Sequence, residues 1–219
     1  MKKVAIAYRG LFNYKKYSKE GLYQEYFSEI ENTLNNHKKM MHSYFDDCEI
    51  DCFFSTYDVD KKIEEIYKTN LEVKNFSYLR KDGWYDSWKP ILHHTQNLIN
   101  DIEGYVERTR NQYDFLVFTR PDILFKSHIN SFSIDSNKFN ITLEHLSGNC
   151  DDNLWIFPIK YFQFFKESIN ELNLKNMISH EINHCLKKRD VSINYMTNYA
   201  PDPQPDGSDM GHKVFNFCR

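Results

Sequence analysis

Glycine is scarce in this chain: only 7 of its 219 residues are glycine. None of them forms the G-x-G-x-x-G pattern of dinucleotide-binding loops or the G-x-x-x-x-G-K pattern of phosphate-binding loops. The sequence therefore excludes both glycine-based routes to phosphate binding. Any phosphate group bound by this protein has to be met by charged side chains or a metal ion.

Cysteine pairs and long apolar runs are also missing. The five cysteines are an odd number and include no C-x-x-C pair, so neither a disulfide framework nor a zinc ribbon is predicted. The apolar run at residues 4–8 is too short for a secretion signal, and no segment approaches the roughly 18 apolar residues of a membrane span. We therefore expect reduced thiols, no membrane span and a cytoplasmic location.

The charge balance argues against a nucleic-acid partner. Lys and Arg number 28 against 31 Asp and Glu, whereas a general nucleic-acid binder needs a basic footprint. Hydrophobic residues make up 41% and aromatic residues 16%, which is too much apolar material for a disordered chain. The length suits one core, so a single domain over residues 1–219 is predicted.

Strand and helix patterns alternate along the first 125 residues. Continuous apolar runs, and runs in which apolar and polar residues alternate, predict strands. Apolar residues at three- and four-residue steps predict amphipathic helices. The expected strands are 4–8, 49–57, 72–78, 113–119, 139–143 and 191–195, and the expected helices are 20–41, 61–67, 91–110, 160–172 and 177–188. The tail from Ala200 is expected to be loop. This order is typical of βαβ units, so we predict an α/β fold with a mostly parallel sheet flanked by helices.

Charged residues follow three of the predicted strands. In open parallel sheets ligands bind beyond the carboxyl ends of the strands, so Arg9–Gly10, Thr56–Asp58 and Arg120–Asp122 should converge there. Arginine provides a planar fork for phosphate oxygens, and aspartate provides the hard oxygen ligands that Mg²⁺ or Mn²⁺ prefers. Taken alone, the R-P-D turn is better explained by a solvated corner with an Arg–Asp pair.

Four segments in order resemble small glycosyltransferases of the GT-A type. The segment DFLVFTRPDILF at 114–125 is similar to their strand-turn-strand with an R-x-D variant of the D-x-D motif, and VAIAYRG at 4–10 to their first strand and nucleotide-binding turn. The segments DCFFSTYD at 51–58 and DDNLWIF at 151–157 are similar to their second strand and to the acidic segment near the donor sugar. The resemblance extends to polysaccharide-building enzymes, including small chlorovirus transferases.

This resemblance implies a GT-A-like fold and a hexosyltransferase type of activity. The donor would be a nucleoside diphosphate sugar, with UDP as the expected carrier, and the acceptor a glycan, a glycoprotein or another hydroxyl compound. Mn²⁺ or Mg²⁺ would assist. The nucleotide and donor site would include the following residues: Tyr8, Arg9, Gly10, Thr56, Asp58 and Arg120. For a strand-end Thr or Tyr, packing is an equally good explanation.

The motif residues carry over one by one. Asp122 matches the last acid of the metal motif, while Arg120 stands where the first acid usually is. Asp122 would thus hold the ion alone with water and the diphosphate, or Arg120 would replace part of the ion's charge. The resemblance makes His212 a second candidate metal ligand, because a C-terminal histidine sometimes completes the metal shell in that family; a solvent-facing histidine is the alternative. The adjacent Asp151 and Asp152 are candidate catalytic residues: they point to opposite sides of an extended segment, so one could bind the donor sugar or act as base. An exposed acidic turn is the alternative.

A second motif points to a different class of enzyme. Residues 180–184 spell H-E-x-x-H, which on a helix places His180 and His184 on one face beside Glu181, as in zinc metalloproteases. The extension that supplies a third histidine is missing, although Asp190 or His212 could complete such a site. A nucleotide-sugar-binding module without turnover is a third possibility.

Overall fold

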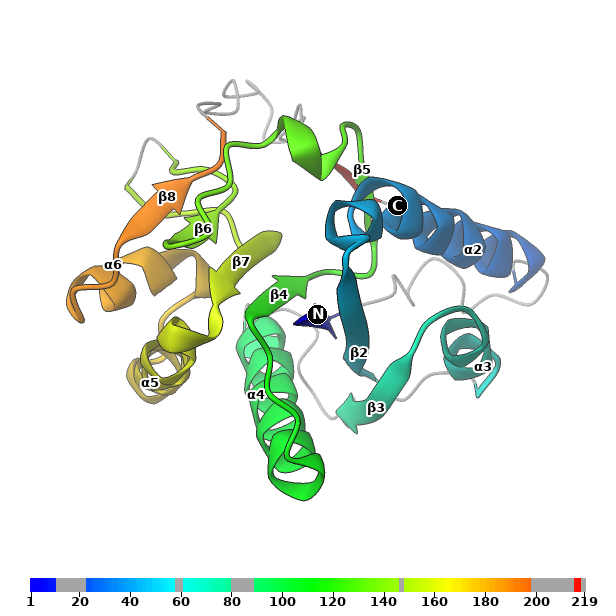
Figure 1. The fold of residues 1–219 in the computed structure, drawn as a ribbon, viewed down its shortest axis with the longest axis horizontal. Coiled ribbons are helices and arrows are strands. Elements are labelled where there is room, and N and C mark those ends of the chain that lie inside the picture. The colour runs from blue at the N-terminus through cyan, green and yellow to red at the C-terminus, as the bar shows by residue number, and fades with distance from the viewer. Residues whose placement is uncertain (11–22, 58–60, 80–88, 146–147, 198–214, 218–219) are drawn as a thin grey trace.

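A seven-stranded sheet runs through the middle of the protein (Figure 1). The computed structural model describes residues 1–10, 23–57, 61–79, 89–145, 148–197 and 215–217. The sheet has the order β3-β2-β1-β4-β7-β6-β8, and β7 alone among these strands runs antiparallel to its neighbours. Its strands are β1 (Lys2–Arg9), β2 (Cys48–Tyr57), β3 (Val73–Leu79), β4 (Phe115–Thr119), β6 (Phe139–Ile141), β7 (Leu154–Pro158) and β8 (Ile193–Tyr195). The predicted α/β fold with a mostly parallel sheet is confirmed.

Helices cover both faces of this sheet (Figure 1). α2 (Tyr23–Met40) and α3 (Lys61–Asn70) lie on one face. α4 (Lys89–Thr109), α5 (Phe162–Lys175) and α6 (Ile182–Lys187) lie on the other. Short 3-10 turns join several elements: η1 (His42–Phe45), η2 (Ile129–Ser131), η3 (Ile159–Tyr161) and η4 (Ser179–Glu181).

The central strand β1 is buried on both faces. Val4, Ile6 and Tyr8 pack on the side of α2 and α3, whereas Ala5 and Ala7 pack on the side of α4, α5 and α6. This double burial explains the continuous apolar run in the sequence, since a strand between two helical layers has no solvent face. The alternation continues to the end of the strand and turns Arg9 toward the α4 side.

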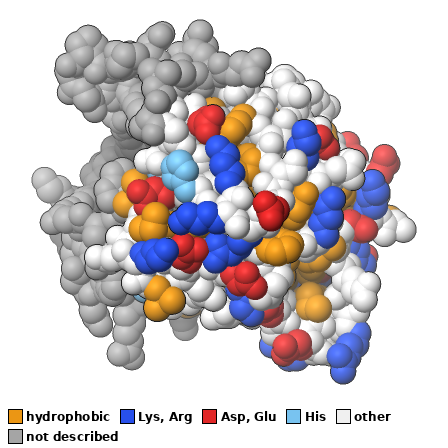
Figure 2. All heavy atoms as spheres, turned by 90° about the vertical axis from the view of Figure 1, so that its left-hand side faces the viewer, with side chains coloured by type: hydrophobic (Ala, Val, Ile, Leu, Met, Phe, Trp, Pro, Cys, Tyr) orange, Lys and Arg blue, Asp and Glu red, His pale blue; other side chains and the backbone are white. Residues whose placement is uncertain are grey.

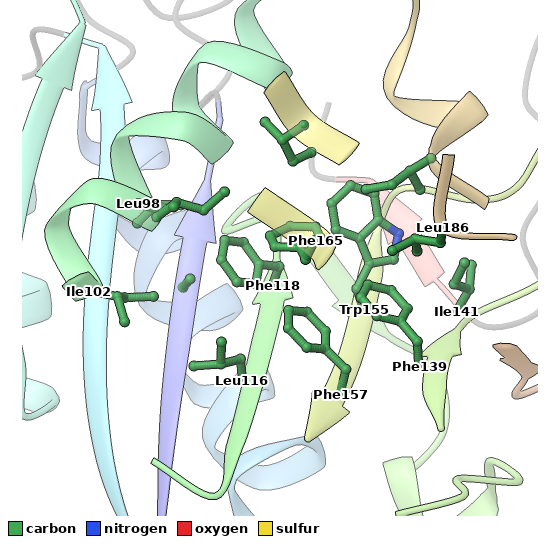
Figure 3. Packing of buried hydrophobic residues seen from close by; sticks show 14 of the residues in the cluster. Leu98, Ile102, Leu116, Phe118, Phe139, Ile141, Trp155, Phe157, Phe165 and Leu186 are labelled. Atoms are coloured by element: carbon green, nitrogen blue, oxygen red, sulfur yellow. The ribbon is translucent and has the colours of Figure 1, made fainter. Parts of the chain in front are cut away.

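An aromatic cluster fills the α4–α5–α6 side of the sheet (Figure 3). The ring centroids of Phe139 and Phe157 are 4.3 Å apart, and Phe165 of α5 lies 4.8 Å from Phe118 and 4.9 Å from Phe157. Each such side chain contributes about 1.5–3 kcal/mol when it is fully buried. Trp155 belongs to the same cluster, and it brings the packed core up to the end of β1.

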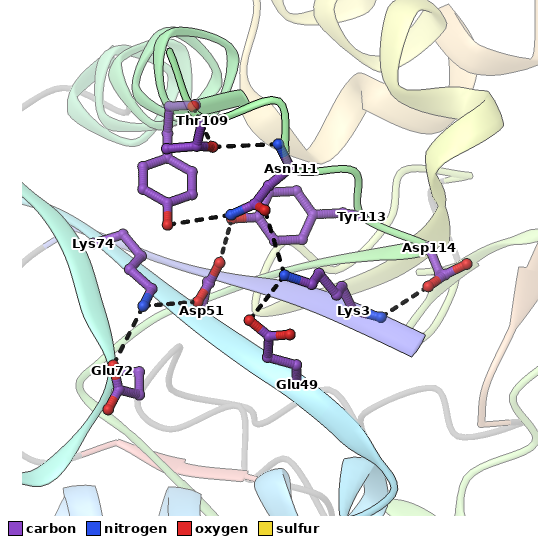
Figure 4. A network of polar contacts seen from close by, with 10 residues as sticks. Lys3, Glu49, Asp51, Glu72, Lys74, Thr109, Asn111, Tyr113 and Asp114 are labelled. Carbon is purple, nitrogen blue, oxygen red and sulfur yellow. Dashed lines mark hydrogen bonds and ion pairs between the residues drawn. The ribbon is translucent and has the colours of Figure 1, made fainter. Parts of the chain in front are cut away.

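A polar network occupies the amino ends of the parallel strands (Figure 4). The buried carboxylate of Asp51 accepts a hydrogen bond of 2.7 Å from the Tyr113 hydroxyl and pairs with Lys74 Nζ at 3.2 Å. Burial, together with the hydrogen bond to Asp51, raises the pKa of Tyr113. The network therefore accounts for this buried acid as part of the fold, at the sheet edge opposite to Arg9.

Three parts of the prediction need correction. The helix expected at 177–188 begins instead as the turn η4, and α6 is regular only from Ile182 to Lys187. The tail was expected to be loop, but residues 215–217 form β9 (Phe215–Phe217), which pairs antiparallel with β5 (Ile123–Phe125). Residues 154–157 were predicted only as part of the acidic segment, whereas the structure has the strand β7 there. In both strands the pairing partner lies far away in sequence, so local pattern alone does not reveal it.

The surface on the α5–α6 side carries charges of both signs. Figure 2 shows acidic and basic side chains interspersed over this face. Arg189 Nη1 lies 2.8 Å from Glu171 and Lys187 Nζ lies 3.1 Å from Glu144. Within the described part of the chain, no helix is both long and apolar enough to cross a membrane.

Candidate functional site

The carboxyl ends of β1 and β4 and the amino end of β7 meet at one edge of the sheet. Tyr8 pairs with Thr119, and Thr119 pairs with Leu154. Because β7 runs in the opposite direction, the residues that precede it lie at the same edge as the residues that follow β1 and β4. This edge brings together two arginines and three carboxylates from the predicted set: Arg9, Arg120, Asp122, Asp151 and Asp152.

Arg120 and Asp122 form a two-point ion pair. Arg120 Nε donates to Asp122 Oδ1 at 2.9 Å, and Nη2 donates to Oδ2 at 2.7 Å. Burial acts to lower the pKa of Arg120, but Asp122, Asp152 and Asp151 together outweigh burial and raise this pKa above its ordinary value. Both carboxylate oxygens of Asp122 are therefore engaged by one guanidinium group, in the fork geometry that arginine favours.

Arg9 is buried completely, with 0% of its surface exposed. Its guanidinium carbon lies 3.7 Å from the centroid of the Trp155 ring, and Nη1 donates to Thr95 Oγ1 at 3.4 Å. Nε and Nη2 have no hydrogen-bond partner within the described structure. Burial lowers the pKa of Arg9 to about 10, against the opposing attraction of Asp152. An unpartnered arginine edge of this kind is costly to bury and therefore calls for an explanation.

The acidic pair is buried, so the alternative of an exposed acidic turn is wrong. Asp151 Oδ1 accepts a hydrogen bond of 2.7 Å from Asn153 Nδ2 within its own loop. Asp152 faces η4, where its Oδ2 accepts a 2.5 Å hydrogen bond from Ser179 Oγ and its Oδ1 lies 3.7 Å from His180 Nε2. The two side chains thus have different surroundings.

Asp152 is held in its charged form. Burial acts to raise the pKa of Asp152, but His180, Arg9 and Arg120 together outweigh burial and lower it. Arg9, Arg120 and His180 therefore all lie near one buried carboxylate, which offsets the repulsion between the two arginines. The arrangement is suited to holding an anion beside a hydrogen-bond acceptor.

Two other predicted residues lie on the opposite face of the sheet. Tyr8 stacks on Phe54 with centroids 4.5 Å apart, and its hydroxyl lies 2.8 Å from His42 Nε2. Thr56 is 1% exposed, and its hydroxyl has no hydrogen-bond partner in the described structure. The contacts of Tyr8 are those of a core residue, and nucleotide binding by Tyr8 and Thr56 stays a prediction.

The remaining predicted residues are a glycine and two side chains beyond the described ranges. Gly10 has a φ of +96° and donates its N–H to Ser55 O at 3.1 Å, so the chain turns there in a conformation that favours glycine. Asp58 and His212 lie outside the described residues.

The described residues do not fit a divalent cation at Asp122. Both of its oxygens are taken by Arg120, as described above. Within the described ranges, no three side chains of His, Cys, Asp or Glu are grouped so that they could hold a metal ion. In this arrangement Asp122 orients Arg120.

The H-E-x-x-H segment is split between two elements. His180 lies in η4 and contacts Asp152, whereas His184 lies in α6 with Nε2 at 3.2 Å from Asn149 Oδ1. The expectation of a single helix carrying both imidazoles is therefore wrong. The absence of a three-ligand group among the described residues also leaves this motif without a third zinc ligand there.

Three residues of the site, Trp155, Thr95 and Ser179, were missed from sequence, and His180 was considered only as a zinc ligand. Trp155 supports Arg9 and donates its indole N–H to Asp151 O at 3.0 Å, while Thr95 contacts Arg9 from α4. Ser179 and His180 contact Asp152. Trp155 lies within the recognised acidic segment, so a search for aromatic partners of a buried arginine would have found it. Thr95 has no sequence signal, since it lies in the middle of an ordinary amphipathic helix.

Comparison with known proteins gives matches in structure only. No protein-family profile and no curated protein sequence matches the chain. The chain is similar to the apo-form glycosyltransferase GlyE of Streptococcus pneumoniae TIGR4, with 10% identity over 88% of this chain and a TM-score of 0.49. It is also similar to a putative nucleotide-diphospho-sugar transferase from Desulfovibrio desulfuricans G20, with 11% identity over 89% of this chain and a TM-score of 0.47. The matches cover 45% of the first protein and 80% of the second, and at these identities they concern the fold alone.

Proposed function

We propose that this protein transfers a sugar from a nucleoside diphosphate sugar to a hydroxyl group of a glycan or glycoprotein, as a transferase of the hexosyl type. The observation that carries the proposal is the buried Arg9, whose Nε and Nη2 have no partner within the described structure, beside Arg120 and a charged Asp152. This group lies at the carboxyl edge of a mostly parallel sheet, where such folds bind ligands. UDP is the proposed carrier, by the resemblance of the sequence motifs.

The two arginines would stabilise the leaving group. In the transfer, the acceptor oxygen forms a bond to the anomeric carbon while the bond from that carbon to the diphosphate oxygen breaks, and the electron pair leaves with the diphosphate. Arg9 and Arg120 would take up this negative charge, an electrostatic task for fixed positive groups. Asp122 would contribute by holding Arg120 in place through both of its oxygens.

The acidic pair would handle the hydroxyl groups. Asp152 is charged and already held by Ser179, so it would accept a hydrogen bond from the sugar or the acceptor and fix its orientation. The acceptor proton would pass to a carboxylate of this pair, with Asp151 as the second candidate. Mn²⁺ or Mg²⁺ is proposed from the resemblance alone. Since the described residues do not fit a cation, no step here depends on one.

A ligand panel tests the proposal. Thermal unfolding is followed with UDP, GDP, UDP-glucose and UDP-galactose, each with and without Mn²⁺, for the wild type and for Asp122→Ala. We expect UDP and at least one UDP-sugar to raise the midpoint temperature and Asp122→Ala to weaken this effect, because Arg120 loses its anchor. If no nucleotide raises the midpoint under any metal condition, the proposal is wrong.

Two further measurements separate the alternatives. Slow release of free UDP from a UDP-sugar indicates a transferase that uses water in place of its acceptor, whereas binding without any release indicates a binding module. A zinc protease would instead contain stoichiometric zinc that is lost in His184→Ala. Elemental analysis of the purified wild type and of this variant decides that point.

A further inference from the structure

We propose that Arg9 binds a phosphate group of the donor through two parallel hydrogen bonds along its Nε–Nη2 edge, and that Trp155 and Thr95 are positioning residues that hold this edge in place. The inference rests on the proposed function and makes it more specific. It identifies which side of Arg9 meets the ligand and which neighbours determine its orientation. We call Nε and Nη2 of Arg9 the open edge.

The hydrogen bonds of Arg9 leave one edge of its guanidinium group without a partner in the described structure. Nη1 is taken by Thr95 Oγ1 at 3.4 Å, and Thr95 Oγ1 in turn donates to Ile91 O at 2.7 Å. The threonine hydroxyl is therefore fixed by its own helix and accepts from Arg9 in one direction. Nε and Nη2 have no partner within the described structure. These two N–H groups form the fork that matches two oxygens of a phosphate group.

Trp155 fixes the plane of the guanidinium group. The guanidinium carbon lies 3.7 Å from the ring centroid, which is the distance of a stacked contact, and the indole N–H is anchored to Asp151 O at 3.0 Å. The ring itself is 0% exposed and is packed edge-on against Phe165, with centroids 5.5 Å apart. Trp155 thus has little freedom to rotate, so it holds the open edge in one direction.

The acids nearby do not occupy the open edge. Asp152 and Asp151 attract Arg9, as the causes of its pKa show, yet neither forms a hydrogen bond with it in the described structure. Asp152 is engaged instead by Ser179, and Asp151 Oδ1 by Asn153. The protein therefore supplies charge balance for Arg9 at a distance and leaves its best hydrogen-bond donors for another group.

Burial makes the open edge a strong phosphate site. In water, a guanidinium group has to give up bound water before it pairs with phosphate. Arg9 has already lost that water on folding, because it is 0% exposed. Because Nε and Nη2 are buried in the ligand-free protein, a phosphate oxygen reaches them only when the groups that cover them move aside. Once there, it gains a charge-assisted hydrogen bond in a low-dielectric setting, without any further desolvation of the arginine.

Titration calorimetry with UDP, in the presence and absence of Mn²⁺, tests the assignment on four variants. Arg9→Lys keeps the positive charge and removes the fork, so we expect UDP binding to weaken by at least about tenfold. Thr95→Val and Trp155→Phe loosen the guanidinium group and keep most of the packing, so each should weaken binding by about threefold, and Trp155→Leu by about tenfold. Arg108→Lys, at an exposed arginine of α4, is the matched control and should bind like the wild type.

A direct readout separates a positioning role from a purely structural one. Arg9 Nε–H should give a slowly exchanging arginine resonance in a proton–nitrogen NMR spectrum, identified by its loss in Arg9→Lys. We expect UDP and inorganic pyrophosphate to shift this resonance and uridine to leave it unchanged. Trp155→Leu should broaden it even where circular dichroism shows the variant to be folded, and Trp155→Phe should restore it in part.

The outcomes are distinct. If UDP binds to the wild type but leaves the Arg9 resonance in place, or binds equally well to Arg9→Lys, the inference is wrong and the proposed function still stands. If no nucleotide of the panel, GDP included, binds under any metal condition, the proposed function itself fails. If UDP binds and shifts the resonance while pyrophosphate does not, the contact is not to the diphosphate and the inference is overturned.

Discussion

Replacing Arg9 by methionine should make the ligand-free protein more stable. Methionine lacks the guanidinium group that lies over the Trp155 ring, but it carries no charge and its flexible side chain adapts to an irregular apolar gap. The side chain is 0% exposed, so solvent does not screen its charge in the folded state. The substitution therefore removes a buried cation and leaves most of the packing intact.

The expected gain follows from the pKa of Arg9. Burial lowers this pKa to about 10, a net value that already includes the opposing attraction of Asp152 and Asp151. Since this pKa is well below that of an arginine in water, the folded state disfavours the charged form by about 3 kcal/mol. Removing the charge therefore stabilises the folded state, but loss of the cation–π contact with Trp155 offsets about 1–2 kcal/mol of this stabilisation. We expect Arg9→Met to raise the free energy of unfolding by about 1–2 kcal/mol.

Urea unfolding at pH 7 without nucleotide measures this change. Arg108→Met serves as control, because Arg108 is exposed on α4 and its replacement should change the free energy by less than about 0.5 kcal/mol. A loss of stability in Arg9→Met would refute the reasoning, since it would mean that attraction to the acidic pair exceeds the cost of burial. The same variant should lose UDP binding, which would make Arg9 a residue kept for function at the expense of stability.

Three further substitutions test the fold. Phe165→Ala should destabilise the protein by about 3–5 kcal/mol in the urea assay, because it leaves a cavity in the aromatic cluster. Phe164→Ala is the control: Phe164 is 39% exposed, so this substitution should lower the free energy of unfolding by less than about 1 kcal/mol. Burial lowers the pKa of His94 to about 3. As the pH falls below about 6.5, His94 therefore binds a proton in the unfolded chain but stays neutral in the folded chain. The free energy of unfolding consequently decreases between about pH 6.5 and pH 3. His94→Gln should therefore reduce the slope of unfolding free energy against pH by about 1.4 kcal/mol per pH unit in that window, and an unchanged slope would contradict the burial of a neutral imidazole. Gly10→Ala should cost about 1–2 kcal/mol because of the φ of +96°, and a neutral result would mean that the turn relaxes.

The parallel half of the sheet could be predicted because its signals are local. Residues 4–8 are apolar without interruption, and the structure buries them on both faces. The helices between the strands repeat at the helical period, so their existence was clear although their ends moved by a few residues. Convergence of Arg9 with Arg120 followed from one rule, that the carboxyl ends of parallel strands share an edge.

The rest depends on contacts across long distances in sequence. β9 is a strand because it pairs with β5, and three residues offer no periodic signal of their own. The direction of β7 decides that Asp151 and Asp152 reach the same edge as Arg9, and strand direction is not encoded in local pattern. The pairing of Arg120 with Asp122 was one of two readings of the R-P-D turn, and only the side-chain geometry distinguishes it from a metal ligand.

The reversed strand β7 also bears on how the site forms in time. Arg9 comes from the first strand of the chain, while its platform Trp155 arrives on a strand that docks beside β4 only after a long intervening segment has closed. Closing the long stretch of chain between Arg9 and Trp155 carries an entropy cost before any contact rewards it, so we expect this contact to form late in folding. A ligand held between these elements would then stabilise contacts that we expect to be absent from the transition state. Such a ligand should slow unfolding markedly and leave the folding rate almost unchanged, so that occupancy by donor prolongs the lifetime of the native protein.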